Sequence, residues 1–252
     1  MTTDSRARFA AAVHAEPVDT VLACLLIGCE VEPDLRLEPS YQALDRLAAS
    51  VRLGSRAPAD AAHALQRALV HEAGFGGRDA DYEDLRSSLL HEVLRRGRGL
   101  PIMLSLVWTE VAARVGVRAS CLGLPGHVMV CLGDPEGDHV VVDPFHGGGV
   151  RDVAPHPVLE GNDLVLRVLT NIRALTARSF ESARSRLWAT ELSLLLPRHP
   201  LDLRRERGEL LVRLGSYAAG AAELETYAAA VPDEALAEQA RRSARLARAR
   251  MN

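Results

Sequence analysis

The sequence predicts an α+β protein followed by an all-helical tail, and three observations support this. Apolar residues recur at helical spacing over residues 1–75. Short runs rich in valine and leucine, separated by turn residues, occupy residues 117–143. Helical periodicity then returns from Val165 to the end of the chain. Helices segregated from a small antiparallel sheet are typical of the α+β class.

The elements follow from local signals along the chain. Proline introduces the helices predicted at Val18–Cys29 and Ser40–Val51, where it suits the first helical turn. A third helix, Ala57–Ala73, ends at Gly74, and glycine is common just beyond a helix C-terminus. We then expect a loop, two helices, three strands and a linker, in this order: Phe75–Asp84, Arg86–Arg96, Ile102–Val115, Val117–Gly123, His127–Leu132, His139–Asp143 and residues 151–163. The predicted domains are therefore residues 1–163 and 164–252.

The tail contains one helical hairpin with the pattern of a 34-residue tetratricopeptide repeat. Helices Leu203–Leu214 and Tyr217–Ala230 form this hairpin, and helices Phe180–Pro197 and Glu234–Arg250 flank it. Small and apolar residues recur at the spacings of that repeat: Gly208, Gly215, Gly220, Leu224, Tyr227 and Pro232. Such hairpins bury a face only by stacking on neighbours, so the same helices also fit a cap on the first domain. A protein or peptide partner on the tail is the expected interaction.

Composition excludes several classes of protein. The net charge of −3 argues against binding of nucleic acid through bulk positive charge. All 30 basic residues are arginine, so no lysine is present to form a Schiff base. Residues Met1–Arg8 are polar, and no apolar run reaches the roughly 20 residues that span a bilayer. We expect a cytoplasmic protein with no membrane partner, no nucleic-acid partner and no cofactor.

Three features between Gly99 and Asp143 carry the candidate chemistry. Gly99-Leu100-Pro101 leads into a buried helix, His127 begins a strand, and Asp143 ends the next strand. A helix N-terminus, a strand histidine and a strand aspartate are the parts of a triad that activates a thiol. On antiparallel neighbours, His127 and Asp143 come within hydrogen-bond reach. Taken alone, the pair is weak evidence for catalysis, and a structural hydrogen bond between a neutral histidine and a carboxylate is the favoured interpretation.

The order helix, strand, histidine, strand, Asp-Pro resembles the transglutaminase-like superfamily, whose domain is papain-like. More narrowly, the chain resembles the bacterial SirB-type (invasion-regulator) family, which joins such a domain to tetratricopeptide repeats. The segments that carry the resemblance include Tyr82-x-Asp84-x-Arg86-x-Ser88, Gly99-Leu100-Pro101-Ile102, Gly123-Leu124-Pro125-Gly126-His127, Asp143-Pro144-Phe145-x-Gly147-Gly148 and Arg167-x-Leu169-x-Asn171. The chain departs from the family at Arg78, Ser87, His91, Met103 and Val128.

The resemblance implies that the nucleophile position falls on Pro101, which has no nucleophilic atom, while His127 and Asp143 occupy the other triad positions. A non-catalytic binding, scaffold or regulatory protein is the expected function. The alternative is an atypical hydrolase or acyl-transfer enzyme that acts on amide-type substrates through His127 and Asp143. The residues expected to line the cleft are Tyr82, Arg86, Glu92, Met103, Ser105 and Phe145.

Several other residues are candidates for a replacement nucleophile or for metal ligands. Ser105 lies one helical turn beyond Pro101, Cys121 lies on the preceding strand, and Cys131 follows His127 at a distance of roughly 13 Å along its strand. A buried core thiol is the alternative for the two cysteines, and Ser105 lacks the first-turn position that activates a nucleophile. The residues His91, Glu92, His139 and His146, with the candidate pair, show no spacing of a helix-borne metal site, so no metal is predicted.

Overall fold

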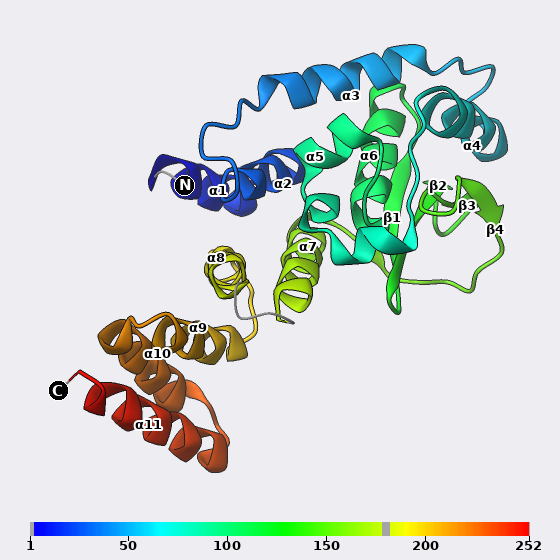
Figure 1. Ribbon diagram of the computed structural model, residues 1–252. Coiled ribbons are helices and arrows are strands. Elements are labelled where there is room, and N and C mark those ends of the chain that lie inside the picture. Colours follow the sequence, from blue (N-terminus) through cyan, green and yellow to red (C-terminus); the bar gives the residue numbers. More distant parts are fainter. Residues whose placement is uncertain (1–2, 178–181, 252) are drawn as a thin grey trace.

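The computed structural model describes residues 3–177 and 182–251, so Phe180 and the terminal residues Met1, Thr2 and Asn252 lie outside the described residues. In Figure 1 the small sheet lies at one end and the last three helices at the other. The described α-helices are α1 (Thr3–His14), α2 (Thr20–Gly28), α3 (Glu38–Ser50), α4 (Pro58–Gln66), α5 (Leu90–Arg96), α6 (Pro101–Arg114), α7 (Gly161–Thr176), α8 (Ala183–Ser193), α9 (Asp202–Arg213), α10 (Tyr217–Ala230) and α11 (Glu234–Ala249). The strands are β1 (Ala119–Leu124), β2 (His127–Gly133), β3 (His139–Asp143), β4 (Gly149–Arg151) and β5 (Val158–Leu159).

The sheet is antiparallel throughout, with the strand order β4-β3-β2-β1-β5. Strands β1 and β2 form a hairpin in which Leu124 pairs with His127, and Gly126 adopts the left-handed conformation (φ 70°) that its two-residue turn requires. The three predicted strands are confirmed. The linker prediction was wrong at Val158–Leu159, because this segment pairs with β1 as the fifth strand. A strand of two residues is too short to show the alternation of apolar and polar residues by which strands are predicted.

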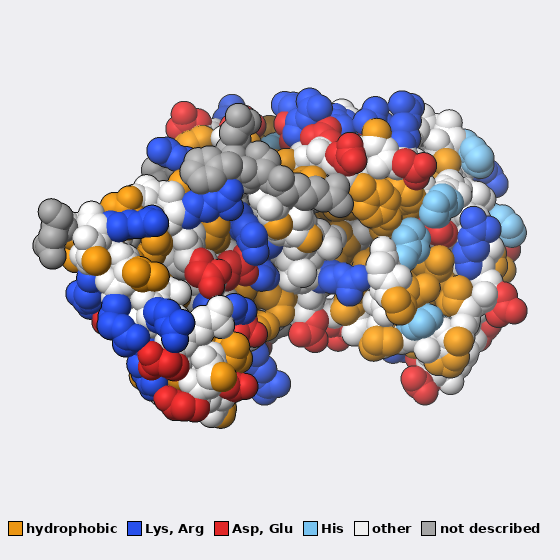
Figure 2. Space-filling view, turned by 60° about the horizontal axis from the view of Figure 1, so that its bottom comes forward, with side chains coloured by type: hydrophobic (Ala, Val, Ile, Leu, Met, Phe, Trp, Pro, Cys, Tyr) orange, Lys and Arg blue, Asp and Glu red, His pale blue; other side chains and the backbone are white. Residues whose placement is uncertain are grey.

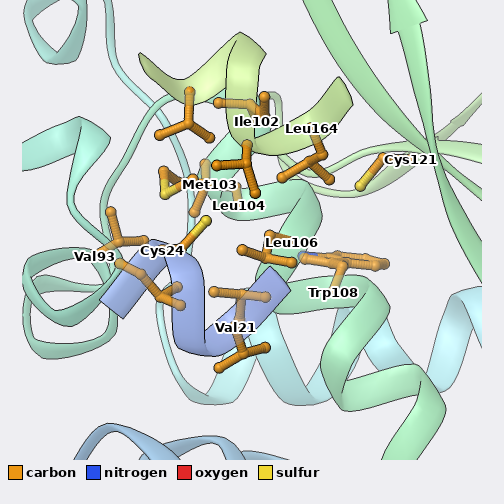
Figure 3. Close-up of a cluster of buried hydrophobic side chains, with 14 of the residues drawn as sticks. Val21, Cys24, Val93, Ile102, Met103, Leu104, Leu106, Trp108, Cys121 and Leu164 are labelled. Carbon is orange, nitrogen blue, oxygen red and sulfur yellow. The ribbon is translucent and has the colours of Figure 1, made fainter. Parts of the chain in front are cut away.

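Helix α6 is the centre of the hydrophobic core. Almost its whole length is buried, and Trp108 has no exposed surface. Figure 3 shows side chains of α6 meeting Val21 and Cys24 from α2, Val93 from α5, Cys121 from β1 and Leu164 from α7. Burying one large apolar side chain contributes about 1.5–3 kcal/mol, so this contact set is the main source of stability for the domain. The predicted buried helix is confirmed.

Two predicted elements before α6 differ in detail. Helix α4 passes at Arg67 into a π-helical turn, Arg67–Glu72. Helix α5 begins at Leu90, four residues later than expected, because the Asp84 carboxylate accepts from the Arg86 backbone N–H and starts a separate 3-10 turn. The predicted loop before Asp84 contains another 3-10 turn, Asp79–Glu83.

The main core continues across the domain division expected after residue 163. Apolar side chains of α7 and α8 belong to the same buried cluster as α6, whereas α9, α10 and α11 have small clusters of their own. The carboxylate of Glu206 on α9 binds Arg173 of α7 and Arg186 of α8. The division at residue 163 therefore stays a prediction, and α7 and α8 are packed with the first domain. Among the described helices, none is both long and apolar enough to span a bilayer.

The hairpin of α9 and α10 depends on two glycines that let the helices approach closely. A Cβ at Gly208 would lie 2.8 Å from Leu224 and 3.1 Å from the Gly220 carbonyl oxygen.

We expect Gly208→Val to destabilise the tail by about 1–3 kcal/mol, because a side chain at this contact must push the helices apart. Urea unfolding followed by circular dichroism measures this loss. The control is Ala219→Val on the exposed side of α10, and an equal loss in both variants would contradict the prediction.

Candidate functional site

The structure brings the predicted histidine and aspartate together at one end of the sheet. His127 begins β2 and Asp143 ends the antiparallel neighbour β3, which places the two residues near each other across the pair. The Nε2 atom of His127 lies 3.0 Å from Oδ1 of Asp143. The His127 side chain is 17% exposed and that of Asp143 only 3%. The hydrogen bond is therefore present, and its catalytic role stays a prediction.

The Asp143 carboxylate accepts more than this one bond. Its Oδ1 atom accepts from the backbone N–H groups of Phe145 and His146, and its Oδ2 atom lies 2.7 Å from Nδ1 of His146. Burial by itself raises the pKa of this carboxyl, but the hydrogen bonds and charges of the two histidines outweigh burial and lower the pKa to about 2. Asp143 is therefore a carboxylate at neutral pH.

A charged carboxylate fixes the tautomer of neutral His127. Because Nε2 faces Asp143, the ring proton lies on Nε2 and is donated to the carboxylate, which leaves Nδ1 as an acceptor. In the described part of the chain Nδ1 has no hydrogen-bond partner. The edge of the His127 ring meets the Phe145 ring at a centroid distance of 6.0 Å, and Phe145 also contacts Tyr82. The imidazole is thus held on two sides.

A cavity of about 180 Å³ lies beside this pair, between the start of α6, the start of β2 and helix α7. Pro101, the first residue of α6, lines the cavity together with His127. In Figure 2, histidine side chains lie beside a patch of hydrophobic side chains on the right-hand part of the face shown. The lining residues are Tyr82, Leu100, Pro101, Ile102, Gly126, His127, Val128, Arg167, Asn171, Ala174 and Leu175.

Only part of the predicted lining set is found at the cavity. Tyr82 lines it, and Phe145 supports Tyr82 and His127 from behind. The predictions for the remaining four residues were wrong. Arg86 is exposed and binds Asp84, and the buried Glu92 binds Arg95 away from the cavity. Met103 is fully buried in the main core, and Ser105 is buried with its hydroxyl bonded to the Val128 carbonyl oxygen.

Sequence reasoning missed the wall that α7 provides. Arg167 and Asn171 are four residues apart and therefore share one face of α7, and both line the cavity. The helix was expected to belong to the tail, so its residues were not considered for the cleft. The signal was present, because the segment Arg167-x-Leu169-x-Asn171 carries part of the family resemblance.

The candidate replacement nucleophiles do not reach the cavity. Ser105 donates to the Val128 carbonyl oxygen at 3.3 Å and has no exposed surface. Cys121 points into the main core, where burial raises the pKa of its thiol to about 12. Cys131 packs with Leu122 and Val141 on the other face of the sheet, and burial raises its pKa as well.

Three ligand atoms that could hold a metal ion are brought together although the sequence predicted no metal site. One atom each from His127, Asp143 and His146 lie within 4.8 Å of one another. Two strands and a loop supply these residues, so no regular spacing marks them in the sequence. Both imidazoles already bind the carboxylate, and a cation would have to replace those hydrogen bonds. His91 and Glu92 lie elsewhere, beside Glu32.

The fold and the site together define a transglutaminase-like domain joined to tetratricopeptide hairpins, which confirms the resemblance. Residues 38–156 match the transglutaminase-like superfamily, and residues 172–252 match the tetratricopeptide repeat. The chain belongs to the family of UPF0162 proteins. It is 30% identical over 245 residues to the UPF0162 protein of Xylella fastidiosa strain 9a5c, which covers 86% of this chain and 85% of that protein.

More distant relatives cover the chain in part. The UPF0162 protein of Vibrio cholerae is 23% identical over 135 residues, which are 52% of this chain and 50% of that protein. The F-box only protein 21 of Mus musculus is 26% identical over 158 residues, which are 54% of this chain and 25% of that protein. No solved structure was found to match the chain.

Removal of the buried charge tests the role of Asp143. Its pKa is lower in the folded protein than the ordinary 3.8, so its carboxylate stabilises the fold fully above about pH 4 and less as the pH falls toward 2. We expect Asp143→Asn to lose about 2 kcal/mol at pH 7, and the difference from wild type to shrink between about pH 4 and pH 2.

Urea unfolding at a series of pH values measures this difference. The control is Asp138→Asn, in the exposed turn before β3. A difference that stays constant down to pH 2 would show that the loss comes from altered packing and not from the charge.

Proposed function

We propose that this protein is a non-catalytic binding protein, in which the transglutaminase-like domain has lost its nucleophile and kept the His127–Asp143 pair. The observation that carries the proposal is the position of Pro101. It is the first residue of α6 and lines the cavity together with His127. The resemblance to the superfamily puts the nucleophilic cysteine at this position. A proline ring offers no atom for covalent catalysis, although it suits the first turn of a helix.

The surroundings of the cavity support this proposal. Nucleophilic catalysis needs a thiol or hydroxyl within hydrogen-bond reach of the base. The cysteines of the chain are free and buried, and none of the four lines the cavity. The Ser105 hydroxyl is engaged by a backbone carbonyl. Free thiols are typical of reducing compartments, which supports the proposal that the protein acts in the cytoplasm.

The tail supports a partner that is a protein or peptide. Helices α9, α10 and α11 stack as consecutive antiparallel pairs, and tetratricopeptide hairpins stacked in this way present extended surfaces to protein segments. The contacts of Glu206 with α7 and α8 hold this surface against the first domain. A scaffold or regulatory protein that presents the tail to a partner fits both observations.

A second candidate is a hydrolase in which His127 activates a water molecule. One observation favours it: the Nδ1 atom is an open acceptor, and the ionised Asp143 would stabilise the imidazolium that proton transfer creates. In this mechanism no covalent intermediate forms. The water molecule activated by His127 would attack the amide-type substrate directly.

Reintroducing a thiol separates the two candidates. We expect wild type to show no amide hydrolysis or amine transfer that depends on His127, and Pro101→Cys to carry a reactive thiol. At pH 6 that thiol should react with iodoacetamide roughly tenfold faster than in Pro101→Cys combined with His127→Ala, because the imidazole, which only the first variant keeps, stabilises the thiolate. Mass spectrometry of the alkylated peptides measures the rates.

The four native cysteines serve as an internal reference, since all are buried. Turnover by wild type that disappears in His127→Ala would contradict the non-catalytic proposal and favour the water-activating one. Equal alkylation rates in the two Pro101→Cys variants would show that His127 does not serve the nucleophile position.

A further inference from the structure

Arg167 lies in the wall of the cavity and has no counter-ion among the described residues. The residue is half-buried and donates through Nη2 to the Leu124 carbonyl oxygen at 3.2 Å. Within residues 3–177 and 182–251, every other half-buried arginine forms an ion pair with an aspartate or glutamate. A partly desolvated charge with no carboxylate beside it, facing a cavity, favours an anionic ligand.

Asn171 adds a second polar group to the same wall. It lies one helical turn beyond Arg167 and lines the same cavity. Its amide has no hydrogen-bond partner among the described residues. A guanidinium and a carboxamide on one helix face together supply several N–H donors, and a planar carboxylate matches the fork of an arginine.

His127 adds an acceptor to the lining of the same cavity. Its Nδ1 atom is unprotonated when Nε2 donates to Asp143, and no described residue donates to it. A ligand that carries an N–H group near its carboxylate would match both the donors of α7 and this acceptor. The amide of an N-acylated amino acid has this pairing, because its N–H and its carboxylate are attached to the same carbon.

Cavity size and lining limit the rest of the ligand. A volume of about 180 Å³ is smaller than the roughly 300–1,000 Å³ of sites for drug-sized molecules, so a single residue fits. Between the polar groups the lining is apolar: Leu100, Pro101, Ile102, Val128, Ala174 and Leu175. An aliphatic side chain is the matching group.

We propose that this cavity binds the carboxylate of an N-acylated apolar amino acid, with Arg167 and Asn171 holding the carboxylate and His127 accepting the amide N–H. Two sources share this chemistry, a free acylamino acid and the C-terminal residue of a peptide. This inference goes beyond the proposed function and holds whether or not the domain is catalytic.

Calorimetric titration of the full chain tests the proposal with N-acetyl-L-leucine and its neutral analogue N-acetyl-L-leucinamide. We expect the acid to bind and the amide to bind at least about tenfold more weakly, because the charge-assisted hydrogen bonds are lost. Arg167→Gln should weaken binding of the acid by about 10- to 100-fold, and Asn171→Ala by less. Arg52→Gln, an exposed arginine outside the cavity, should bind as wild type.

A third titration, with an acetylated tripeptide that ends in leucine, distinguishes the two sources of the ligand, a free acylamino acid and a peptide C-terminus. Tighter binding of the tripeptide indicates a peptide C-terminus, and weaker binding indicates a free acylamino acid. Thermal melts of each variant check the fold, and Arg167→Met, which also removes the charge and keeps a long unbranched side chain, replaces Arg167→Gln if the latter does not fold. Equal affinity for acid and amide, no saturable binding of the acid, or unchanged binding by the folded Arg167 and Asn171 variants would each overturn the proposal.

Discussion

The buried carboxylate of Asp143 is the interaction on which the site depends. A charge that is almost removed from water is tolerated only when donors surround it, and here two backbone N–H groups and two imidazoles do so. The backbone donors fix the turn after β3, and that turn places Phe145 against Tyr82 and His127. One carboxylate therefore sets the orientation of the histidine and the position of the aromatic wall behind it.

Pro101 and Asp143, which both lie at the site, are under different physical constraints. The start of α6 needs a residue that suits a first helical turn, and Pro101 meets that need without a thiol. Asp143 cannot be replaced so easily, because its loss would leave buried donors without an acceptor. The fold therefore does not need a thiol at the start of α6, whereas it does need a carboxylate at residue 143. The hydrogen bond between His127 and Asp143 has this structural explanation and is not by itself a sign of catalysis.

The sequence determined the long elements well and the short ones poorly. Periodicity over ten or more residues identified α6 and the α9–α10 hairpin, whereas β4 and β5, of three and two residues, exist only through pairing with neighbours. His127 and Asp143 were predictable because antiparallel neighbours bring strand ends together. Glu92 was misplaced because the sequence does not show which face of the short helix α5 is turned toward the cavity. Arg167 was missed because only packing shows that α7 closes the cavity.

Helix α7 joins the two halves of the molecule. One part of it, with Arg167 and Asn171, lines the cavity, and Arg173, two residues further, binds Glu206 of the tail. The burial of α7 in the main core makes it a rigid connection and not a linker. Since linkage between two sites is reciprocal, a cavity ligand and a tail partner that both favoured one placement of α7 would each change the affinity for the other by the same free energy.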